Sequence, residues 1–340
     1  MKKILFITEH PAPYWDKTFR TLEKQVDITV LYIDHKVKSK PWNDYEPFDG
    51  KYYVNPVKLI KLLINHDTIV IGGYYRIELR ISMFFSFLLF KKTHLFSDVS
   101  SDRKRNFIMI LLKSILYKFF DKILVSGKKG IEIFNLTYGV KKSKLLYFPY
   151  AWEFKKNISN VNNFSRNRLN VLICNRFIFR KGHHVLLSAL ESCSEKLLDS
   201  FNFTFIGDGE LKDQTVEGLK RIPNLMFDVK GWVDFEVYKK ILSKSDIMIH
   251  ASLFEPYGIP VLDALNQGLI VIISDGVMSG YDFVENEVNG FIYPAKSSSE
   301  LKNRLKYIAE NRSSLKKISD NAKLTLPEYK SLIKTAVELI

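Results

Sequence analysis

The stretch FEPYGIPVLD, residues 254–263, connects a short apolar run to a segment with helical periodicity. Ile247–His250 before it reads as a buried strand, and Val261–Asn266 reads as the first turns of a helix. A helix start presents unpaired N–H groups and a positive dipole end, which favour phosphate. Glu255 lies in the turn and Asp263 lies about two helical turns further on. Either both carboxylates border a ligand held at the helix start, or Glu255 caps the helix and Asp263 is a solvated surface residue.

Short apolar runs alternate with helical patterns on both sides of this stretch. Strands are expected at residues 4–8, 28–33, 68–72, 94–96, 122–126, 170–174, 203–207, 225–229, 247–250, 270–273 and 290–293. Helices are expected at 18–25, 77–90, 103–120, 129–138, 182–190, 210–219, 237–243, 261–266 and 298–311. This alternation predicts parallel sheets whose ligands lie beyond the carboxyl ends of the strands. That rule places Glu9–Trp15, Gly72-Gly73 and Asp98 on one rim of the first sheet.

A change in composition separates two such alternations. Residues 153–168 are rich in Asn, Ser and Lys, as in an inter-domain linker. The expected domains are residues 1–152 and 169–325, and a C-terminal helix over 326–340 could pack back on the first domain. We expect an α/β fold of two Rossmann-like, doubly wound domains that face each other across a cleft.

The composition limits the class of protein. A chain of 340 residues with 46% apolar residues fits two packed domains. Two cysteines form neither a disulfide framework nor a zinc pattern, which favours a reducing cytosol. The longest apolar run, residues 81–90, is too short to span a bilayer. The histidines have no metal-ligand companions, and His94, His183 and His184 are expected to be structural.

Positive charge is concentrated in the first half of the chain. Residues 1–150 contain 26 Lys and Arg against 14 Asp and Glu, whereas residues 151–340 contain 25 against 23. This asymmetry indicates an anionic partner, either nucleic acid or an anionic membrane surface. The helical segments 80–92 and 103–122 combine apolar runs with basic ends. We expect their apolar faces to pack mainly on the sheet, and their basic ends to bind anionic vesicles in a salt-sensitive way.

Two loops of the second half carry candidate chemistry. NRFIFRKG, residues 175–182, places Arg176 and Lys181 at a strand end, where they either neutralise a leaving diphosphate or form a solvated basic loop. IGDGE, residues 206–210, is a strand-to-helix turn whose glycines permit close backbone approach. The full G-x-G-x-x-G dinucleotide fingerprint is absent from the sequence.

In order and spacing, these motifs resemble the GT-B-fold glycosyltransferases of retaining family 4, the glycosyl transferases group 1. The resemblance extends through KGWV (230–233), SDI (245–247), EPYG (255–258) and EVNGF (287–291). It implies that Arg176 and Lys181 bind the donor diphosphate and that Glu255 lies beside the donor sugar.

The resemblance implies further contacts to the donor. Amides near Gly258-Ile259 bind phosphate, and the amide near Val233 lies beside the base. A family glutamate that binds the nucleotide ribose is replaced here by Asp263, which is one methylene shorter. The substrate-binding candidates are Gly207, Gly209, Val233, Glu255, Tyr257, Gly258, Ile259 and Asp263.

The first half resembles a subset that builds bacterial surface polysaccharides. FSD (96–98) and FPYAWE (148–153) carry this likeness, which makes Asp98 a candidate to act in catalysis or to position the donor sugar. HPAPYW, residues 10–15, stands where the family has a glycine-rich loop.

The resemblance implies retaining, metal-independent transfer from a nucleotide sugar to a lipid-linked or nascent glycan. It implies no cofactor, and a cytoplasmic protein peripheral to the membrane. Two alternatives remain: a sugar-nucleotide epimerase or phosphorylase of similar architecture, and a basic nucleic-acid-binding protein. The second alternative lacks helix-turn-helix, zinc-finger or RNA-binding signatures.

Overall fold

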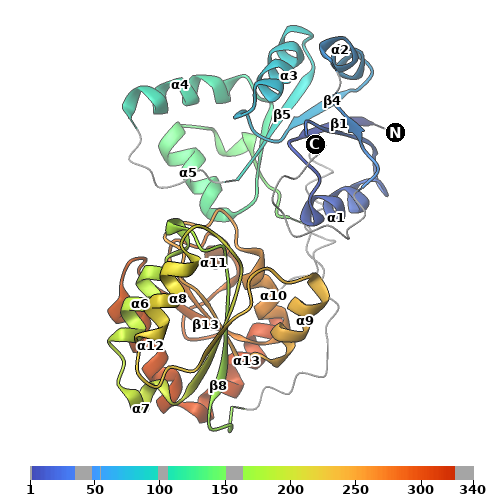
Figure 1. Cartoon of the computed structure of the whole chain (residues 1–340). Helices are drawn as coiled ribbons and strands as arrows, with labels where there is room; N and C mark the ends of the chain where they lie inside the picture. Colours follow the sequence, from blue (N-terminus) through green and yellow to red (C-terminus); the bar gives the residue numbers. More distant parts are fainter. Residues whose placement is uncertain (1, 35–47, 54, 99–105, 151–163, 326–340) are drawn as a thin grey trace. The chain divides into compact units, whose positions relative to one another are not determined.

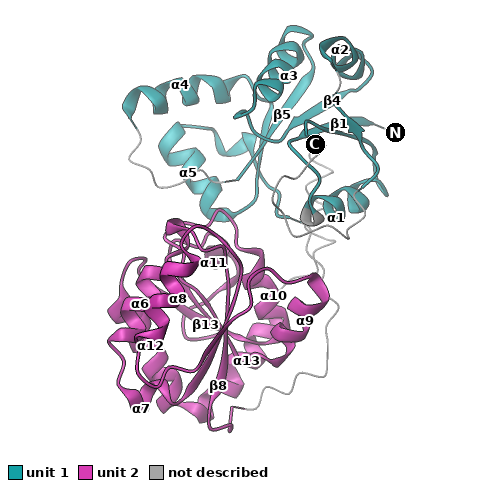
Figure 2. Ribbon diagram, in the orientation of Figure 1, with its two compact units in different colours: residues 1–153, 328–340 teal, residues 154–327 magenta. Residues whose placement is uncertain are grey.

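The computed structural model describes residues 2–34, 48–53, 55–98, 106–150 and 164–325. The chain divides into two compact units, whose described parts end at residue 150 and begin at residue 164 (Figure 2). The expected linker residues 153–163 and the expected C-terminal helix 326–340 lie outside the described residues. Residues 164–168, also expected in the linker, belong to the second unit. Phe164 is buried in its core, and the Arg166 guanidinium lies 3.6 Å from the Asp246 carboxylate.

The described part of the first unit contains a parallel sheet in the order β3-β2-β1-β4-β5-β6-β7 (Figure 1). Its strands are β1 (Lys3–Thr8), β2 (Asp27–Tyr32), β3 (Lys51–Tyr52), β4 (Thr68–Ile71), β5 (Lys92–Ser97), β6 (Lys122–Val125) and β7 (Leu145–Tyr147). Its helices are α1 (Pro13–Leu22), α2 (Pro56–Ile64), α3 (Ile77–Leu88), α4 (Phe107–Lys118), α5 (Lys128–Tyr138) and the 3₁₀ turn η1 (Lys142–Lys144). Ile4 pairs with Ile28 of β2 and Thr68 of β4, so β1 is a central strand. It is apolar almost throughout because helices cover both faces of the sheet.

The rim predicted from strand ends is present in the first unit. Strands β1, β4 and β5 are successive neighbours, so the residues that follow them share one edge. The Tyr75 hydroxyl donates to the Glu9 carboxylate at 2.6 Å, which joins the loops after β1 and β4.

Two strands of the first unit, β3 and β7, were not predicted. Two of its helices also differ from expectation. The helix expected from Thr18 begins at Pro13, because proline is accommodated in a first turn where no N–H partner is needed. Helix α2 was not predicted, although Pro56 begins it and the Asn55 side chain caps it by accepting from the Lys58 N–H at 2.9 Å. Both departures follow ordinary helix-start chemistry.

The described part of the second unit contains a parallel sheet in the order β10-β9-β8-β11-β12-β13. Its strands are β8 (Leu169–Cys174), β9 (Phe201–Ile206), β10 (Phe227–Val229), β11 (Ile247–His250), β12 (Ile270–Ser274) and β13 (Gly290–Tyr293). Its helices are α6 (His183–Glu191), α7 (Glu195–Leu198), α8 (Lys212–Lys220), α9 (Phe235–Lys244), α10 (Ile259–Gln267), α11 (Gly280–Phe283), α12 (Ser298–Glu310) and α13 (Leu315–Leu324), with the 3₁₀ turns η2 (Phe179–Lys181) and η3 (Arg312–Ser314). Helices lie on both sides of the sheet, which gives a doubly wound unit (Figure 1).

The packing of helix α4 differs from expectation. Its apolar side chains were expected to pack mainly on the sheet, but Tyr117 is the buried side chain of this helix. Most of its other apolar side chains are exposed. Among the described residues, no helix is both long enough and apolar enough to cross a bilayer.

Candidate active site

The structure brings together two predicted site residues, Lys181 and Glu255, at the carboxyl ends of β8 and β11. These strands are parallel neighbours, and the loops that follow them are joined by a hydrogen bond from the Leu253 N–H to the Arg180 carbonyl at 2.9 Å. The Lys181 ammonium donates to the Glu255 carboxylate in a largely buried ion pair. Burial alone would raise the pKa of Glu255, but the charge of the neighbouring Lys181 ammonium holds it below its usual value. Glu255 is therefore ionised at neutral pH.

The backbone around Glu255 is fixed by the turn after β12. The Glu255 N–H donates to the Gly276 carbonyl at 2.8 Å, and the Glu255 carbonyl accepts from the Met278 N–H at 3.0 Å. A Cβ on Gly276 would lie 2.4 Å from the Leu253 carbonyl oxygen, so this close approach needs glycine. The position of the carboxylate is thus set by backbone hydrogen bonds rather than by a mobile loop.

His250 is a third member of this group and was not among the predicted site residues. Its Nε2 lies 3.7 Å from the Glu255 carboxylate, and the side chain is 1% exposed. Burial lowers the pKa of His250 to about 4, although the Glu255 charge opposes this shift. The imidazole is therefore neutral at pH 7 and forms a polar contact, not an ion pair. As the last residue of a strand, His250 could have been found by the strand-end rule.

The turn that carries Lys181 depends on Gly182 and His183. Gly182 has a φ of +70°, and a Cβ there would lie 2.0 Å from the Ala251 carbonyl oxygen. The His183 ring stacks on Phe177, and its Nε2 lies 3.0 Å from the Arg176 carbonyl oxygen. The expectation that His183 is structural agrees with these contacts.

Arg176 follows the same strand and differs from Lys181 in its surroundings. Its side chain is exposed, and among the described residues its guanidinium makes no salt bridge. A guanidinium in this position is available to an anionic ligand.

The glycine turn after β9 packs against the loop of Arg176. Gly207 has a φ of +134°, and a Cβ there would lie 2.0 Å from the Asn175 carbonyl oxygen. Gly209 has a φ of +154°, and a Cβ there would lie 2.5 Å from the Phe177 carbonyl oxygen. These contacts explain both glycines by backbone packing, so a ligand is not needed to account for them.

The start of α10 lies immediately after Glu255. Gly258 caps the helix in a left-handed conformation with a φ of +96°, and Ile259 and Pro260 form its first turn. The Tyr257 side chain is buried, and its carbonyl accepts from the Ser279 N–H at 3.0 Å. The early N–H groups of a helix have no intrahelical partner, so this end is suited to bind phosphate.

Asp263 lies on the buried side of α10 and has a partner that the sequence did not reveal. The hydroxyl of Tyr238, on α9, donates to the Asp263 carboxylate at 2.7 Å. Burial, followed by the Asp263 charge, raises the pKa of Tyr238 well above its usual value. Burial and the same charge raise the pKa of Cys174 to about 12, so this thiol stays protonated.

The remaining second-unit candidate, Val233, lies in the loop between β10 and α9 and is half-buried. Trp232 beside it is exposed. The Gly231 carbonyl accepts from the Gly207 N–H at 2.8 Å, which joins this loop to the glycine turn.

Asp98 belongs to the first unit, where it follows β5. The Tyr150 hydroxyl donates to its carboxylate at 2.7 Å. The Tyr150 ring packs edge-on against Trp15 and Phe96, with centroids 5.2 and 5.5 Å away. The carboxylate is therefore oriented by a tyrosine that is itself fixed in an aromatic cluster.

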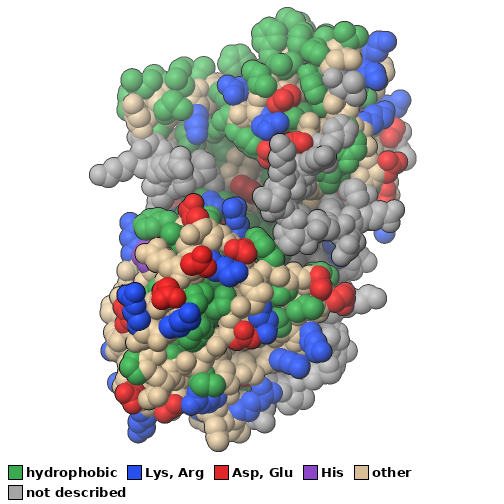
Figure 3. Space-filling view, in the orientation of Figure 1, with side chains coloured by type: hydrophobic (Ala, Val, Ile, Leu, Met, Phe, Trp, Pro, Cys, Tyr) green, Lys and Arg blue, Asp and Glu red, His purple; other side chains and the backbone are tan. Residues whose placement is uncertain are grey.

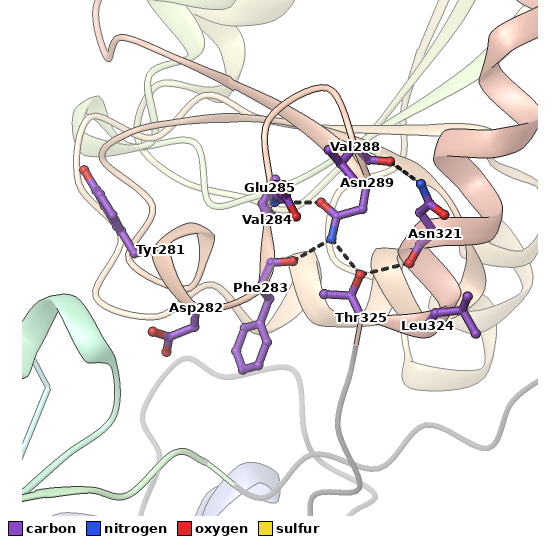
Figure 4. Close-up of a pocket in the computed structure, with 10 residues that line it drawn as sticks. All are labelled: Tyr281, Asp282, Phe283, Val284, Glu285, Val288, Asn289, Asn321, Leu324 and Thr325. Carbon is purple, nitrogen blue, oxygen red and sulfur yellow. Dashed lines mark hydrogen bonds between the residues drawn. The ribbon is translucent and has the colours of Figure 1, made fainter.

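A depression of about 320 Å³ lies elsewhere on the second unit, between the segment around α11 and the end of α13 (Figure 4). The Asn289 amide donates to the Phe283 carbonyl at 3.0 Å and to the Thr325 hydroxyl. The Asn321 amide donates to the Val288 carbonyl at 2.9 Å. The predicted site residues do not line this depression, and its amides hold the two segments together. Among the described residues, no group of three or more His, Cys, Asp or Glu could hold a metal ion.

Comparison with known proteins identifies the family. A family model described as glycosyl transferases group 1 matches residues 154–325, half of the chain, and the chain belongs to this family. Among solved structures, Anabaena HepE in complex with UDP and glucose superposes with a TM-score of 0.77 at 15% identity, covering 99% of both chains. The lipopolysaccharide outer core galactosyltransferase WaaB superposes with a TM-score of 0.74 at 14% identity, also covering 99% of both chains. The chain has the GT-B fold, as predicted.

Curated relatives match over shorter spans. An uncharacterized glycosyltransferase of Methanocaldococcus jannaschii is 28% identical over 156 residues, which are 44% of this chain and 38% of the relative. The GalNAc-α-(1→4)-GalNAc-α-(1→3)-diNAcBac-PP-undecaprenol α-1,4-N-acetyl-D-galactosaminyltransferase of Campylobacter jejuni is 22% identical over 218 residues, 64% of this chain and 58% of the relative. Both matches span less than two thirds of the relative's length.

Proposed function

We propose that the chain is a retaining glycosyltransferase that moves a sugar from a nucleotide diphosphate sugar to a lipid-linked or nascent glycan in surface-polysaccharide synthesis. The observation that carries the proposal is the buried Lys181–Glu255 pair directly before the start of α10. It combines a cation from the β8–α6 connection with an ionised carboxylate and free helix amides from the neighbouring β11–α10 connection. Sugar diphosphates need this set of groups, since the leaving diphosphate gains charge as the glycosidic bond breaks.

In the proposed reaction, the second unit binds the donor and the first unit binds the acceptor. Lys181 and the exposed Arg176 stabilise the leaving diphosphate, and the amides of Gly258 and Ile259 bind its phosphate oxygens. The bond from the anomeric carbon to the phosphate oxygen breaks, and the acceptor oxygen bonds to that carbon on the same face. The acceptor proton passes to the departing phosphate oxygen, and Glu255 orients the sugar.

The remaining parts of the proposal concern Asp98, Asp263 and the cation requirement. Asp98 is proposed to act on or position the donor sugar, and Asp263 is proposed to bind the ribose. Arg176 and Lys181 supply the positive charge that a divalent cation supplies in other transferases, so activity should survive EDTA. Loss of activity in EDTA with recovery in Mg²⁺ or Mn²⁺ would remove this part.

The likenesses guide the choice of donor and acceptor. HepE has been solved with UDP and with UDP-glucose, so uridine diphosphate sugars are the first donors to test. The Campylobacter relative is named for an undecaprenol-linked acceptor, which supports an acceptor held at a membrane surface. The chain would then be a cytoplasmic protein peripheral to that membrane.

A thermal-shift screen of the full chain against nucleoside diphosphates and nucleotide sugars tests donor binding. A ligand at about 100 times its Kd stabilises the folded state by about 2.7 kcal/mol, which raises Tm by several degrees. We expect one base to raise the Tm of the wild type, a smaller rise for Lys181→Ala, and a full rise for the surface control Lys220→Ala. The proposal fails if no nucleotide changes Tm. An epimerase would convert its donor without any acceptor, which product analysis would reveal.

A further inference from the structure

The most unusual surface of the first unit is the outer side of α4. Seven apolar side chains there are between 46 and 76% exposed. We call them the α4 face: Phe107, Ile108, Met109, Leu111, Leu112, Ile115 and Phe119. In Figure 3 apolar side chains gather over α4 and continue over α3. Patches of this kind mark a surface that is covered in the working protein.

Helical spacing shows that the exposure is systematic. At 100° per residue, Phe107, Leu111, Ile108, Ile115 and Leu112 fall within one broad stripe. The opposite side of the helix packs inward, because Tyr117 is buried and its hydroxyl lies 2.9 Å from the Tyr74 hydroxyl. Helix α4 is therefore apolar on both its inner and outer sides, which is unusual for a helix that faces water.

The α4 face continues toward the end of α3. The ring centroids of Phe119 and Phe120 lie 5.8 and 5.2 Å from that of Phe87. Leu88, next to Phe87, is exposed, and so is Phe90 beyond the end of α3. The apolar surface thus spans the ends of two helices.

A cluster of lysines surrounds the C-terminal end of α4. The Lys144 ammonium donates to the carbonyls of Lys118 and Phe120 at 2.9 and 2.7 Å, which attaches η1 to the helix end. The lysine cluster comprises Lys118, Lys122, Lys141, Lys142 and Lys144. The acidic side chain within it, Asp121, accepts from the Thr93 N–H at 2.7 Å. The α4 face therefore has a lysine-rich C-terminal end.

We propose that the α4 face docks on an anionic lipid bilayer, with α4 lying in the plane of the interface. The proposal deepens the proposed function, on which it rests for the membrane-held acceptor. Helix α4 has twelve residues and is about 18 Å long, too short to cross a hydrocarbon core of about 30 Å. An apolar stripe bordered by lysines is the arrangement that binds at the headgroup boundary.

Charge favours a bilayer over a second copy of the chain. A second copy would cover the α4 face with a unit that is itself net positive, since residues 1–150 contain 26 Lys and Arg against 14 Asp and Glu, so its net charge would oppose the lysine cluster. An anionic headgroup layer instead complements every lysine of the cluster.

Co-sedimentation of the full chain with vesicles tests the proposal. Vesicles of phosphatidylcholine alone are compared with vesicles containing phosphatidylglycerol, at low and high salt. We expect binding to the anionic vesicles that weakens with salt, and little binding to the neutral ones. Leu112→Gln should lower the partition coefficient about tenfold, because it removes an inserted apolar side chain. Its control, Met226→Gln, changes a side chain of the second unit that is equally exposed, 54% against 56% for Leu112, and should bind like the wild type.

Two double variants, one in the lysine cluster and one on a control surface, test the contribution of the lysines to vesicle binding. Lys141→Gln/Lys142→Gln should lower anionic-vesicle binding about tenfold or more. Lys316→Gln/Lys317→Gln, an adjacent exposed pair on α13, should leave it unchanged. Sedimentation velocity without vesicles reports the competing dimer.

The proposal is overturned if Leu112→Gln binds vesicles as the wild type does, or if it abolishes a dimer instead of vesicle binding. Donor-dependent release of nucleoside diphosphate, measured without vesicles, reports the proposed function separately. A wild-type protein that turns over the donor but does not bind anionic vesicles would contradict the docking surface alone.

Discussion

The hydroxyl of Tyr238 lies 2.7 Å from a carboxylate oxygen of Asp263, and both side chains are buried. The shorter Asp263 stands where the family motif has a glutamate, and its carboxylate is held by a neighbouring helix. We infer that Tyr238 orients the carboxylate of Asp263, the residue proposed to bind the ribose.

Removal of the Tyr238 hydroxyl tests this relationship. Tyr238→Phe removes this hydrogen-bond donor from a buried carboxylate, which should destabilise the protein by about 1–3 kcal/mol. We expect KM for the donor to rise more than kcat falls, since the ribose contact is made in the ground state and the transition state alike. Tyr307→Phe, on α12, is the control and should change neither quantity. An unchanged KM would show that the contact is only structural.

Loss of the Lys181 ammonium should affect the chemical step most. Lys181→Ala removes a charge-assisted contact to the leaving diphosphate and should lower kcat about a hundredfold, or about 3 kcal/mol. It also leaves Glu255 buried without its cation, so a urea unfolding curve must accompany the kinetics. Lys220→Ala, which breaks the surface pair with Glu217, is the control. Near-normal turnover by a folded Lys181→Ala protein would exclude the proposed role.

Stability should depend on pH through the buried histidines. Burial lowers the pKa of both His183 and His250 to about 4, whereas an unfolded histidine titrates near 6.5. The unfolded chain therefore binds more protons between pH 6.5 and 4, and stability falls as the pH decreases through this window. Each histidine should account for a loss of up to about 3 kcal/mol. Thermal melts at pH 7.5 and 5.5 should show a smaller difference for His250→Gln than for the exposed control His184→Gln. Equal differences for the two variants would contradict the neutral, buried His250.

Two glycine substitutions compare the loss of stability caused by close packing with the loss caused by a left-handed backbone conformation. Gly209→Ala places a Cβ 2.5 Å from the Phe177 carbonyl oxygen at a φ of +154°. It should destabilise the second unit by about 3 kcal/mol or more. Gly139→Ala, at a φ of +63° with open space around it, should cost only about 1 kcal/mol. Urea unfolding of both variants measures the difference, and similar losses would argue against the packed turn.

Several features could be predicted from the sequence because they are local. The period of apolar residues located most strands, and the strand-end rule grouped Arg176, Lys181 and Glu255. The fold and the family follow from motifs that lie within single connections. Tyr238 could not be found this way, because it is 25 residues before Asp263 on a different helix, and tertiary packing alone brings them together. The exposure of α4 could not be predicted either, because an apolar run does not reveal whether it packs in the protein interior or lies on the surface.

The central claim is that the chain transfers a sugar with retention of configuration. It is tested most directly by proton NMR of the reaction mixture, in which the full chain acts on a uridine diphosphate sugar and a lipid-linked glycan acceptor. We expect release of nucleoside diphosphate and a product with the same anomeric configuration as the donor. Both signals should appear about a hundredfold more slowly with Lys181→Ala and at the wild-type rate with Lys220→Ala. Inversion at the anomeric carbon, or conversion of the donor without transfer to the acceptor, would contradict the claim.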